Sequence, residues 1–209
     1  MSYQKLIPSG FVPLNDSIEL KSLEALNLTV GRKGTDEVES VRAVFTAPAA
    51  TAGAVAVTNI ESDSDSQLLF YVQFMNVSKV HSILIQSAVA KGSSAEGAEG
   101  GEGAEEAEGE IRQRPTKIKV WTNLPSILSF DDVTSVPAVY EEDEIAEPDA
   151  EGWSSVKLRY VRFQRVTSLV IYLEGEDDDE PTGVNKILLV GDKGETLAMG
   201  KLEQTHDHD

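Results

Sequence analysis

The segment that decides the fold is Leu68-Leu69-Phe70-Tyr71-Val72-Gln73-Phe74. If it forms a strand, large apolar side chains lie on both of its faces, because successive residues of a strand point to opposite sides. One face carries the even-numbered apolar residues, and the other carries Leu69 and Tyr71. A strand that is apolar on both faces is typically buried on both. The sequence therefore predicts a central strand with a layer of the protein packed on each side of it.

Five further short apolar runs have the alternation or the β-branched composition of strands. Helical periodicity is missing from residue 55 onward, and several runs are separated by more residues than a hairpin turn needs. The sequence therefore predicts an all-β protein, an antiparallel two-sheet jelly-roll-like β-sandwich with long acidic loops. The five runs are Lys79–Gln86, Lys117–Trp121, Val156–Tyr160, Ser168–Leu173 and Lys186–Val190. The third run changes phase at Val161, which predicts a bulge near Tyr160.

The rest of the chain divides into segments around this sandwich. Residues 1–40 are expected to pack on the sandwich, with a short amphipathic helix at 17–26. The sandwich is expected over 41–194, beginning with a short strand at 41–46. Within it, the Gly, Ala, Glu and Ser residues of 92–110 predict a disordered loop, and 195–209 are expected to form a flexible tail.

Charge is distributed unevenly along the chain. It has 36 acidic and 18 basic residues, which gives a formal net charge of −18. Twenty of the acids lie in three stretches that contain no Lys or Arg, namely 92–110, 141–151 and 174–180. The remainder, with 16 acids and 18 bases, is nearly neutral. Because binding to phosphates requires a surplus of cations on one face, we expect no nucleic-acid partner.

Several chemistries are excluded or left without support by the sequence. The chain contains no cysteine, which excludes disulfides, thiolate metal sites and cysteine nucleophiles. It has no signal-peptide pattern at its N-terminus and no apolar run near the roughly 18 residues of a membrane span. No nucleophile elbow, zinc-protease motif or spaced pair of carboxylates is present. We therefore expect a non-enzymatic, intracellular protein with no cofactor and no membrane partner.

The tail histidines and two acidic stretches, the second of them at 174–180, are candidates for metal binding. His206 and His208 alternate in the tail and could reach one metal ion together, but two histidines do not complete a tetrahedral site. Such an ion would belong to a site on a partner, and the alternative is a solvated chain end. The acids Glu61, Asp63 and Asp65 could chelate calcium, or could instead accept hydrogen bonds from backbone amides in a turn.

Basic and aromatic residues are candidates for partner recognition. A basic face is expected around the run 156–160, and the alternative is that this face is simply the solvated side of a sheet. Trp121 and Trp153 could lie in the core or could anchor an interface. The basic face comprises Lys157, Arg159, Arg162 and Arg165, extended by Lys117 and Lys119.

Three longer segments, in this order, resemble the PITH domain family. They are NIESDSDSQLL at 59–69, KVWTNLPSILSFDD at 119–132 and VKLRYVRFQRV at 156–166. Supporting matches are LNDS at 14–17 and ILLVG at 187–191. The resemblance covers most of residues 10–194, and the first two segments carry its most specific elements.

The resemblance implies a jelly-roll sandwich that docks on the regulatory particle of the 26S proteasome. Such a domain acts as an adaptor in the cytoplasm and nucleus and has no catalytic activity of its own. The redox activity of thioredoxin-fused relatives does not carry over, because the chain lacks cysteine. The residues expected to bind the partner are Asn123, Leu124, Pro125, Phe130, Asp131, Asp132, Arg159 and Arg162. The Asn-Leu-Pro turn and the carboxylates could equally be signatures of the fold.

An alternative function of a different class is a small-ligand or carbohydrate-binding jelly roll. In that case Trp121, Trp153 and Tyr160 would stack on a sugar, and the acidic loops would hold calcium. The position of the two tryptophans in the fold separates this hypothesis from the adaptor, because stacking requires exposed rings.

Overall fold

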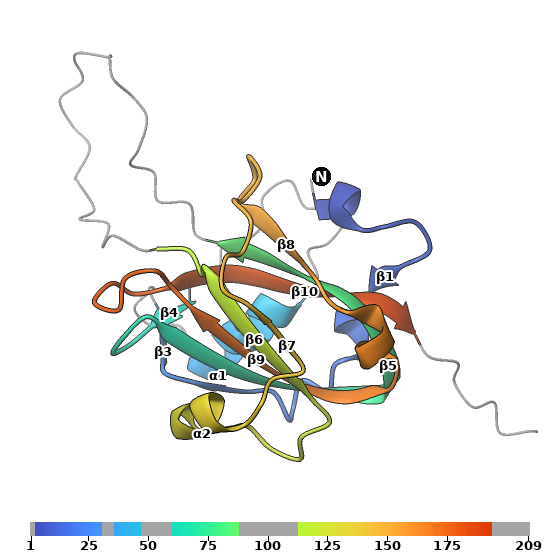
Figure 1. Cartoon of the computed structure of the whole chain (residues 1–209), viewed down its shortest axis with the longest axis horizontal. Helices are drawn as coiled ribbons and strands as arrows, with labels where there is room; N and C mark the ends of the chain where they lie inside the picture. The colour runs from blue at the N-terminus through green and yellow to red at the C-terminus, as the bar shows by residue number, and fades with distance from the viewer. Residues whose placement is uncertain (1–2, 31–35, 47–59, 88–112, 194–209) are drawn as a thin grey trace, which may run out of the picture.

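The computed structural model describes residues 3–30, 36–46, 60–87 and 113–193 of the 209-residue chain. Its strands dominate, and its helices are short (Figure 1). The elements are, in chain order, η1 (Tyr3–Leu6), β1 (Val12–Pro13), η2 (Asn15–Ser17), β2 (Glu24–Leu26), β3 (Leu28–Val30), α1 (Glu37–Phe45), β4 (Ile60–Ser62), β5 (Gln67–Ser87), β6 (Lys117–Thr122), α2 (Phe130–Ser135), β7 (Tyr140–Glu142), β8 (Trp153–Lys157), η3 (Tyr160–Phe163), β9 (Val166–Glu174) and β10 (Gly183–Lys193).

The long strand β5 belongs to two sheets. Its residues 67–73 pair with β9, and 69–71 also pair with β2 on the other side. Its residues 78–87 pair with β10, and 82–86 also pair with β8. Figure 1 shows β5 turning over at the right of the view and running back. The first sheet therefore has the order β2-β5-β9-β6-β7, and the second has β8-β5-β10, with β4 and β1 on the far edge of β10 and β3 beyond β4.

The main hydrophobic core lies between the two sheets. Alternate residues of β5, β6, β9 and β10 point into it, among them Phe70, Val120, Ile171 and Leu189, all fully buried. The outer face of the first sheet is covered by α2 and the segments flanking it, which pack over Trp121. The outer face of the second sheet is covered by N-terminal residues, which pack around Trp153.

The antiparallel two-sheet sandwich confirms the fold class predicted from the sequence. The central strand is covered on both faces, because Phe70 and Val72 belong to the main core whereas Leu69 and Tyr71 lie in the cluster under α2. The predicted alternation of β6 is also confirmed, with Trp121 on the outer face.

The strand predicted at 41–46 is wrong, because residues 41–45 lie in α1. Asp36 caps this helix by accepting hydrogen bonds from two backbone N–H groups of its first turn, at 2.8 and 3.3 Å. Val41, Val44 and Phe45 are buried together at helical spacing. Their β-branched composition favours a strand, but their burial follows the spacing of a helix.

The helix predicted at 17–26 is also wrong. The chain there pairs with β5 at two places joined by a turn: the Glu19 N–H donates to the Gln73 carbonyl at 2.8 Å, and β2 forms the edge of the first sheet. Docking on the edge of β5 outweighs the local helical pattern. The prediction of no helix beyond residue 55 fails at α2, which is a short capped helix.

Two further details of the strands differ from the predictions. The runs 68–74 and 79–86 are one strand that changes partners, not two strands. The bulge predicted near Tyr160 is a 3-10 turn, η3, that follows the end of β8. A shift of register does occur in β5, where His81 is the extra residue between the pairs formed by Val80 and Ser82 with β10.

Two predicted segments lie outside the described residues: the acidic loop 92–110 and the tail 195–209. Among the residues that the structure does describe, none of the helices has the length and apolar character needed to cross a membrane.

Asn15 joins three parts of the fold from a buried position in η2, with 4% of its surface exposed. Its Nδ2 donates to the carbonyls of Phe45 at 2.7 Å and Ile187 at 2.9 Å, and its Oδ1 accepts from the Leu189 N–H at 3.0 Å. The amide thus links the N-terminal segment to the end of α1 and to β10. Three backbone groups depend on one side chain for a hydrogen bond.

We expect Asn15→Ala to lower the free energy of unfolding by about 3 kcal/mol, because it leaves three buried backbone groups without partners. Urea unfolding at neutral pH measures this difference. Asn76→Ala, at an exposed position of β5, is the matched control and should change stability by less than about 0.5 kcal/mol. Equal losses in the two variants would contradict the role of Asn15 as a link.

Candidate functional site

Asn123 forms the turn that follows β6, in a left-handed backbone conformation with φ of 60°. Its Nδ2 donates to the Arg165 carbonyl at 3.0 Å, and its Oδ1 accepts from the Thr167 N–H at 2.8 Å. Its own N–H donates to the Ser168 carbonyl. Asparagine tolerates this conformation better than most residues do. Asn123 therefore clamps the segment that leads into β9, so its side chain is engaged within the chain.

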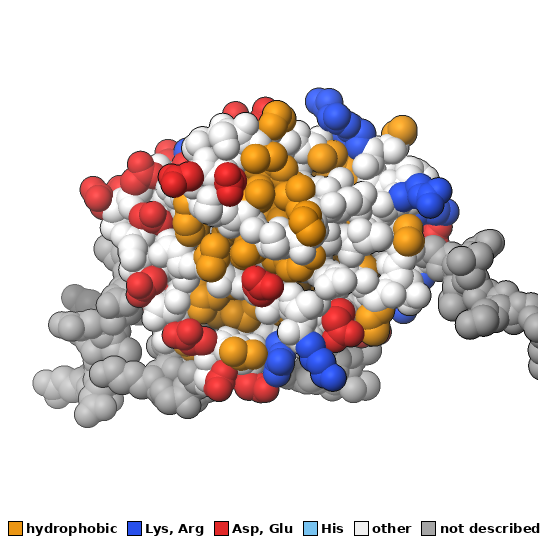
Figure 2. Space-filling model, turned by 90° about the horizontal axis from the view of Figure 1, so that it is seen from below, with side chains coloured by type: hydrophobic (Ala, Val, Ile, Leu, Met, Phe, Trp, Pro, Cys, Tyr) orange, Lys and Arg blue, Asp and Glu red, His pale blue; other side chains and the backbone are white. Residues whose placement is uncertain are grey.

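Leu124 and Phe130 belong to the apolar cover of the first sheet, and Pro125 is exposed beside them. Leu124 and Phe130 are half-buried against the cluster that contains Trp121. The Tyr71 hydroxyl lies 3.3 Å from the carbonyls of both Leu124 and Pro125. Figure 2 shows a band of apolar side chains on the lower face of the molecule.

Asp131 and Asp132 lie in the first turn of α2. Ser129 and Asp132 form a capping box, in which the Ser129 Oγ accepts from the Asp132 N–H and donates to the Asp132 carboxylate at 2.7 Å. These hydrogen bonds from Ser129 lower the pKa of Asp132. Asp131 is exposed in the same turn. The structure thus brings the six candidate residues between 123 and 132 to one region, where most of them stabilise the fold.

Arg159 and Arg162 lie on a different surface, in and beside η3. We call Lys157, Arg159, Val161, Arg162 and Arg165 the basic turn; all five are exposed. Val161, with 84% of its surface exposed, is the most exposed of the large hydrophobic residues described. Figure 2 shows Lys and Arg side chains at the right of the molecule, on the side opposite most of the acids.

The backbone of the basic turn is held in place from several sides. Phe163 is fully buried in the main core, and the Arg162 N–H donates to the Arg159 carbonyl at 2.8 Å. The Arg162 guanidinium donates to the Val139 carbonyl at 3.2 Å. Asn123 holds the end of the turn at Arg165. A fixed turn presents its exposed side chains with little loss of conformational entropy on binding.

His81 lies beside the basic turn and is packed by aromatic rings. Its ring is 4.3 Å from that of Phe11 and 6.0 Å from that of Tyr160, measured between centroids. Burial, and then the positive charge of Lys157, lower its pKa below the ordinary value of 6.5. This half-buried position agrees with the structural role expected for a histidine within a strand.

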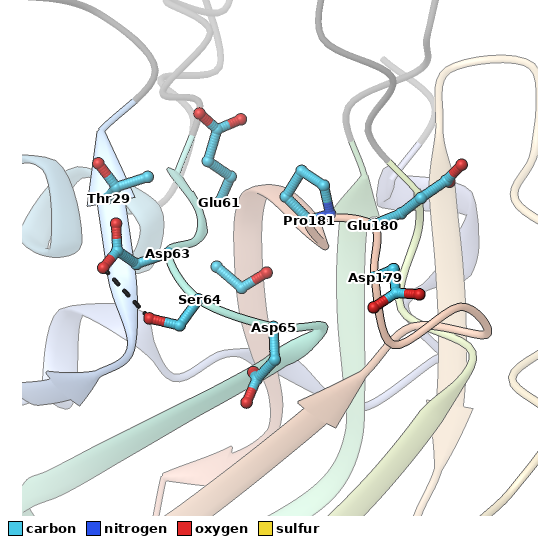
Figure 3. A pocket seen from close by; sticks show the side chains of 9 residues that line it. Thr29, Glu61, Asp63, Ser64, Asp65, Asp179, Glu180 and Pro181 are labelled. Atoms are coloured by element: carbon cyan, nitrogen blue, oxygen red, sulfur yellow. Dashed lines mark hydrogen bonds between the residues drawn. The ribbon is translucent and has the colours of Figure 1, made fainter.

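Glu61, Asp63 and Asp65 line an open hollow of about 620 Å³ together with Asp179 and Glu180 of the β9–β10 loop. Figure 3 shows that these carboxylates point in different directions and do not converge on one centre. Within the described ranges, no three His, Asp or Glu side chains come close enough together to hold a metal ion. Asp65 instead accepts a hydrogen bond from the Gln67 N–H at 2.8 Å. This is the role in a turn that was the alternative to calcium binding.

We call the segments 61–65 and 174–180 the acidic end. Gln113 and Asn27 hold these segments in place, and neither residue was predicted from the sequence to have this role. The Gln113 side chain donates to the carbonyls of Asp177 and Glu180 and accepts from the N–H groups of Glu176 and Asp177. Asn27, at φ of 57°, binds the Asp65 carboxylate at 2.7 Å. The acidic loop 174–180 is therefore an ordered loop held by an amide. A lone glutamine carries no signal in the sequence that could have predicted this contact.

The remaining candidates are buried, paired or outside the described residues. Trp121 and Trp153 are 2% and 3% exposed, so both are core residues. Lys117 pairs with Glu174 at 2.5 Å and belongs to the acidic end, not to the basic turn. His206 and His208 lie outside the described residues.

Comparison with known proteins identifies relatives across nearly the whole chain. A family model described as the PITH domain matches residues 4–207. Thioredoxin-like protein 1 of Schizosaccharomyces pombe is 31% identical over 197 residues, which cover 93% of this chain. The chain spans 56% of that relative's length.

Solved structures are similar at low sequence identity. The family 32 carbohydrate-binding module of Clostridium perfringens NanJ, in complex with galactose, matches with a TM-score of 0.48 and 8% identity, over 86% of this chain and 98% of the module. The F5/8 type C domain of a Bacteroides fragilis protein matches with a TM-score of 0.46 and 8% identity, over 89% and 99%. Allantoicase of Saccharomyces cerevisiae matches with 0.44 and 13%, over 88% and 44%.

We expect Asn123→Ala to destabilise the protein by about 2 kcal/mol, because alanine is strained at positive φ and leaves its backbone partners unpaired. Asn123→Gly relieves the strain but also loses the side-chain hydrogen bonds, so it should be about 1 kcal/mol less destabilising. Urea unfolding measures both differences. If the two variants match the wild type, Asn123 is not a clamp.

Glu174 predicts a pH dependence of stability. Burial opposes its ionisation, but hydrogen bonds from Lys117 and Tyr172 prevail, so its pKa in the folded protein lies below the ordinary value of 4.5. A lowered folded pKa stabilises the protein above the unfolded pKa, and this stabilisation is lost as the pH falls through the folded pKa.

We therefore expect Glu174→Gln to be less stable than the wild type at pH 7, with a difference that shrinks between about pH 5 and pH 3. Glu176→Gln in the neighbouring exposed loop is the control and should parallel the wild type. Unfolding by urea at each pH gives the result, and a constant difference across the range would contradict the role of the carboxylate.

Proposed function

The chain belongs to the PITH domain family, and from this we propose that it is a non-catalytic adaptor that binds the regulatory particle of the 26S proteasome. The PITH-like segments predicted from the sequence support this proposal. The relative in Schizosaccharomyces pombe is nearly twice as long as the matched region, so its other functions do not transfer with the match. No thiol redox activity is proposed, because the chain has no cysteine.

The observation that carries the proposal is the basic turn. It presents an aliphatic side chain, Val161, between two exposed arginines on a fixed backbone. Arginine is enriched at the centres of protein interfaces, where it combines hydrogen bonding with apolar contact along its stem. If the basic turn were only the solvated side of a sheet, a large aliphatic residue such as Val161 would not be expected to be almost fully exposed on it. The basic turn is therefore proposed as the main docking surface.

The residues 123–132 have a supporting part in this proposal. Asn123 fixes the end of the basic turn, and the apolar cover around Leu124 and Phe130 adjoins the turn through the Asn123 loop. Any direct contact that Pro125, Asp131 and Asp132 make with the partner is proposed as peripheral to the turn. His206 and His208 remain proposed as ligands to a metal site of the partner.

The carbohydrate-binding alternative is not favoured by the site. Stacking on a sugar requires exposed aromatic rings, whereas Trp121 and Trp153 are buried. The Trp121 Nε1 donates to the Val136 carbonyl, and Trp153 packs against Tyr3. Tyr160 is engaged with Phe11. We accordingly propose an adaptor that acts in the cytoplasm and nucleus, and not a lectin.

We expect Val161→Ser to weaken binding to purified regulatory particle by about tenfold or more, because docking would bury this exposed side chain and full burial of a valine contributes about 1.5–3 kcal/mol. Titration of the regulatory particle onto the immobilised 209-residue chain gives the dissociation constant. Val38→Ser, at a position of α1 that is 54% exposed, is the matched control and should bind as the wild type does. Both variants should retain the wild-type thermal midpoint.

Two outcomes would contradict the proposal. The wild-type chain could show no binding to the regulatory particle at low salt, where electrostatic contacts are strongest. Alternatively, Val161→Ser and Val38→Ser could bind equally well, which would move the docking surface away from the basic turn.

A further inference from the structure

The strand β8 leads directly into the basic turn and lies at an edge of the second sheet. Among the described residues it pairs with β5 and with no other strand, through residues 153–157. We propose that β8 accepts an added strand from its partner, and that the partner contributes an extended segment with carboxylates facing the basic turn. This inference rests on the proposed docking function and adds the conformation and the charge of the partner segment.

The register of β8 shows which backbone groups face outward. The Leu158 N–H donates to the His81 carbonyl, and the Gly152 carbonyl accepts from the Ser87 N–H, so even-numbered residues face β5. Hydrogen-bonding direction alternates along an antiparallel strand. The N–H and C=O groups of residues 153, 155 and 157 therefore point away from the sheet.

Only the first of these three residues has its outward groups satisfied within the described part of the chain. The Trp153 N–H donates to the Asp149 carboxylate at 3.0 Å, and its carbonyl accepts from the Asp149 N–H at 2.9 Å. No hydrogen bond from the outward groups of Ser155 or Lys157 to any other described residue is present. Both residues are exposed. The open part of the edge thus lies next to the basic turn.

The charge at this edge selects an acidic partner. The ion pairs among the described residues involve Arg42, Lys79, Arg114 and Lys117 and none of the four cations of the basic turn. Unpaired cations at an edge attract carboxylates and disfavour basic segments. Two other short edge strands carry the opposite sign, with Glu24 in β2 and Glu141 and Glu142 in β7.

Two carboxylates near the start of β8 have partners outside the basic turn. Glu147 pairs with Arg114 at 2.6 Å, and Asp149 holds the backbone at Trp153. An isolated edge lysine is a common guard against unwanted strand pairing. Here the lysine is followed within eight residues by three arginines on a fixed turn, which suits recognition of an acidic strand better than protection of the edge. Main-chain hydrogen bonds would supply affinity and the cations would supply specificity.

The test uses the full chain and a synthetic probe, a fluorescent peptide of alternating Glu and Val. We expect Ser155→Pro to weaken binding of this peptide by about tenfold, because proline removes the outward N–H and an edge strand tolerates it. Ser155→Ala keeps the N–H and is the matched control, expected within about twofold of the wild type. Fluorescence anisotropy at low salt measures both.

Two further probes separate strand addition from simple charge attraction. A Glu/Val peptide N-methylated at alternate residues keeps its charge but loses half of its backbone donors, so it should bind about tenfold more weakly. A Lys/Val peptide should not bind. Equal binding of the native and N-methylated peptides, or equal binding by Ser155→Pro and Ser155→Ala with unchanged thermal midpoints, would overturn strand addition.

The outcomes distinguish this inference from the proposed function. If the regulatory particle binds the wild type and Ser155→Pro equally, docking stands and strand addition is wrong. If the Glu/Val peptide binds as expected while the regulatory particle does not bind at all, the acidic-strand site stands and the proteasome is not its partner.

Discussion

The constraint on which the rest of the structure depends is the double membership of β5. One continuous strand of 21 residues pairs with β9 in one sheet and with β10 in the other. Its residues must therefore be apolar on both faces along most of its length, because the core lies on one side and a separate cover lies on the other. Loss of register in this strand would turn core residues outward in both sheets at once.

The irregular parts of the chain are tied to this frame by side-chain amides. Asn15, Asn27, Gln113 and Asn123 each bind backbone or carboxylate groups of a segment distant in sequence. An amide both donates and accepts, so a single side chain can satisfy backbone groups of both kinds in a loop. Asn27 and Asn123 also occupy positive φ, where asparagine is favoured over larger residues. Among the described residues, each of these segments is therefore tied to the sandwich by a side-chain amide.

The strands of the sandwich could largely be predicted from the sequence, whereas the contacts of the loops could not. The alternation of side chains along a strand can be read from neighbouring residues. The segment 68–74, which is apolar on both faces, therefore predicted both the strand and the packing of a layer on each side of it. The strand predicted at 41–46 and the helix predicted at 17–26 are wrong, because an N-cap stabilises a helix in the first region and pairing with β5 outweighs the helical pattern in the second. In the candidate site, the motif at 123–132 could be recognised but its role could not. Whether Asn123 binds a partner or clamps the basic turn depends on contacts more than 40 residues away.

The strand β9 separates the two charged ends of the sandwich. It runs from Val166, next to the basic turn, to Glu174, at the start of the loop held by Gln113. Nine residues of strand span about 30 Å, which exceeds the Debye length of about 8 Å at physiological salt. The acids of one end therefore do little to screen the arginines at the other, although the whole chain carries a net charge of −18. An acidic partner segment would be repelled at the loop 174–180 and attracted at Arg159 and Arg162, so the charge separation orients the partner before any contact forms.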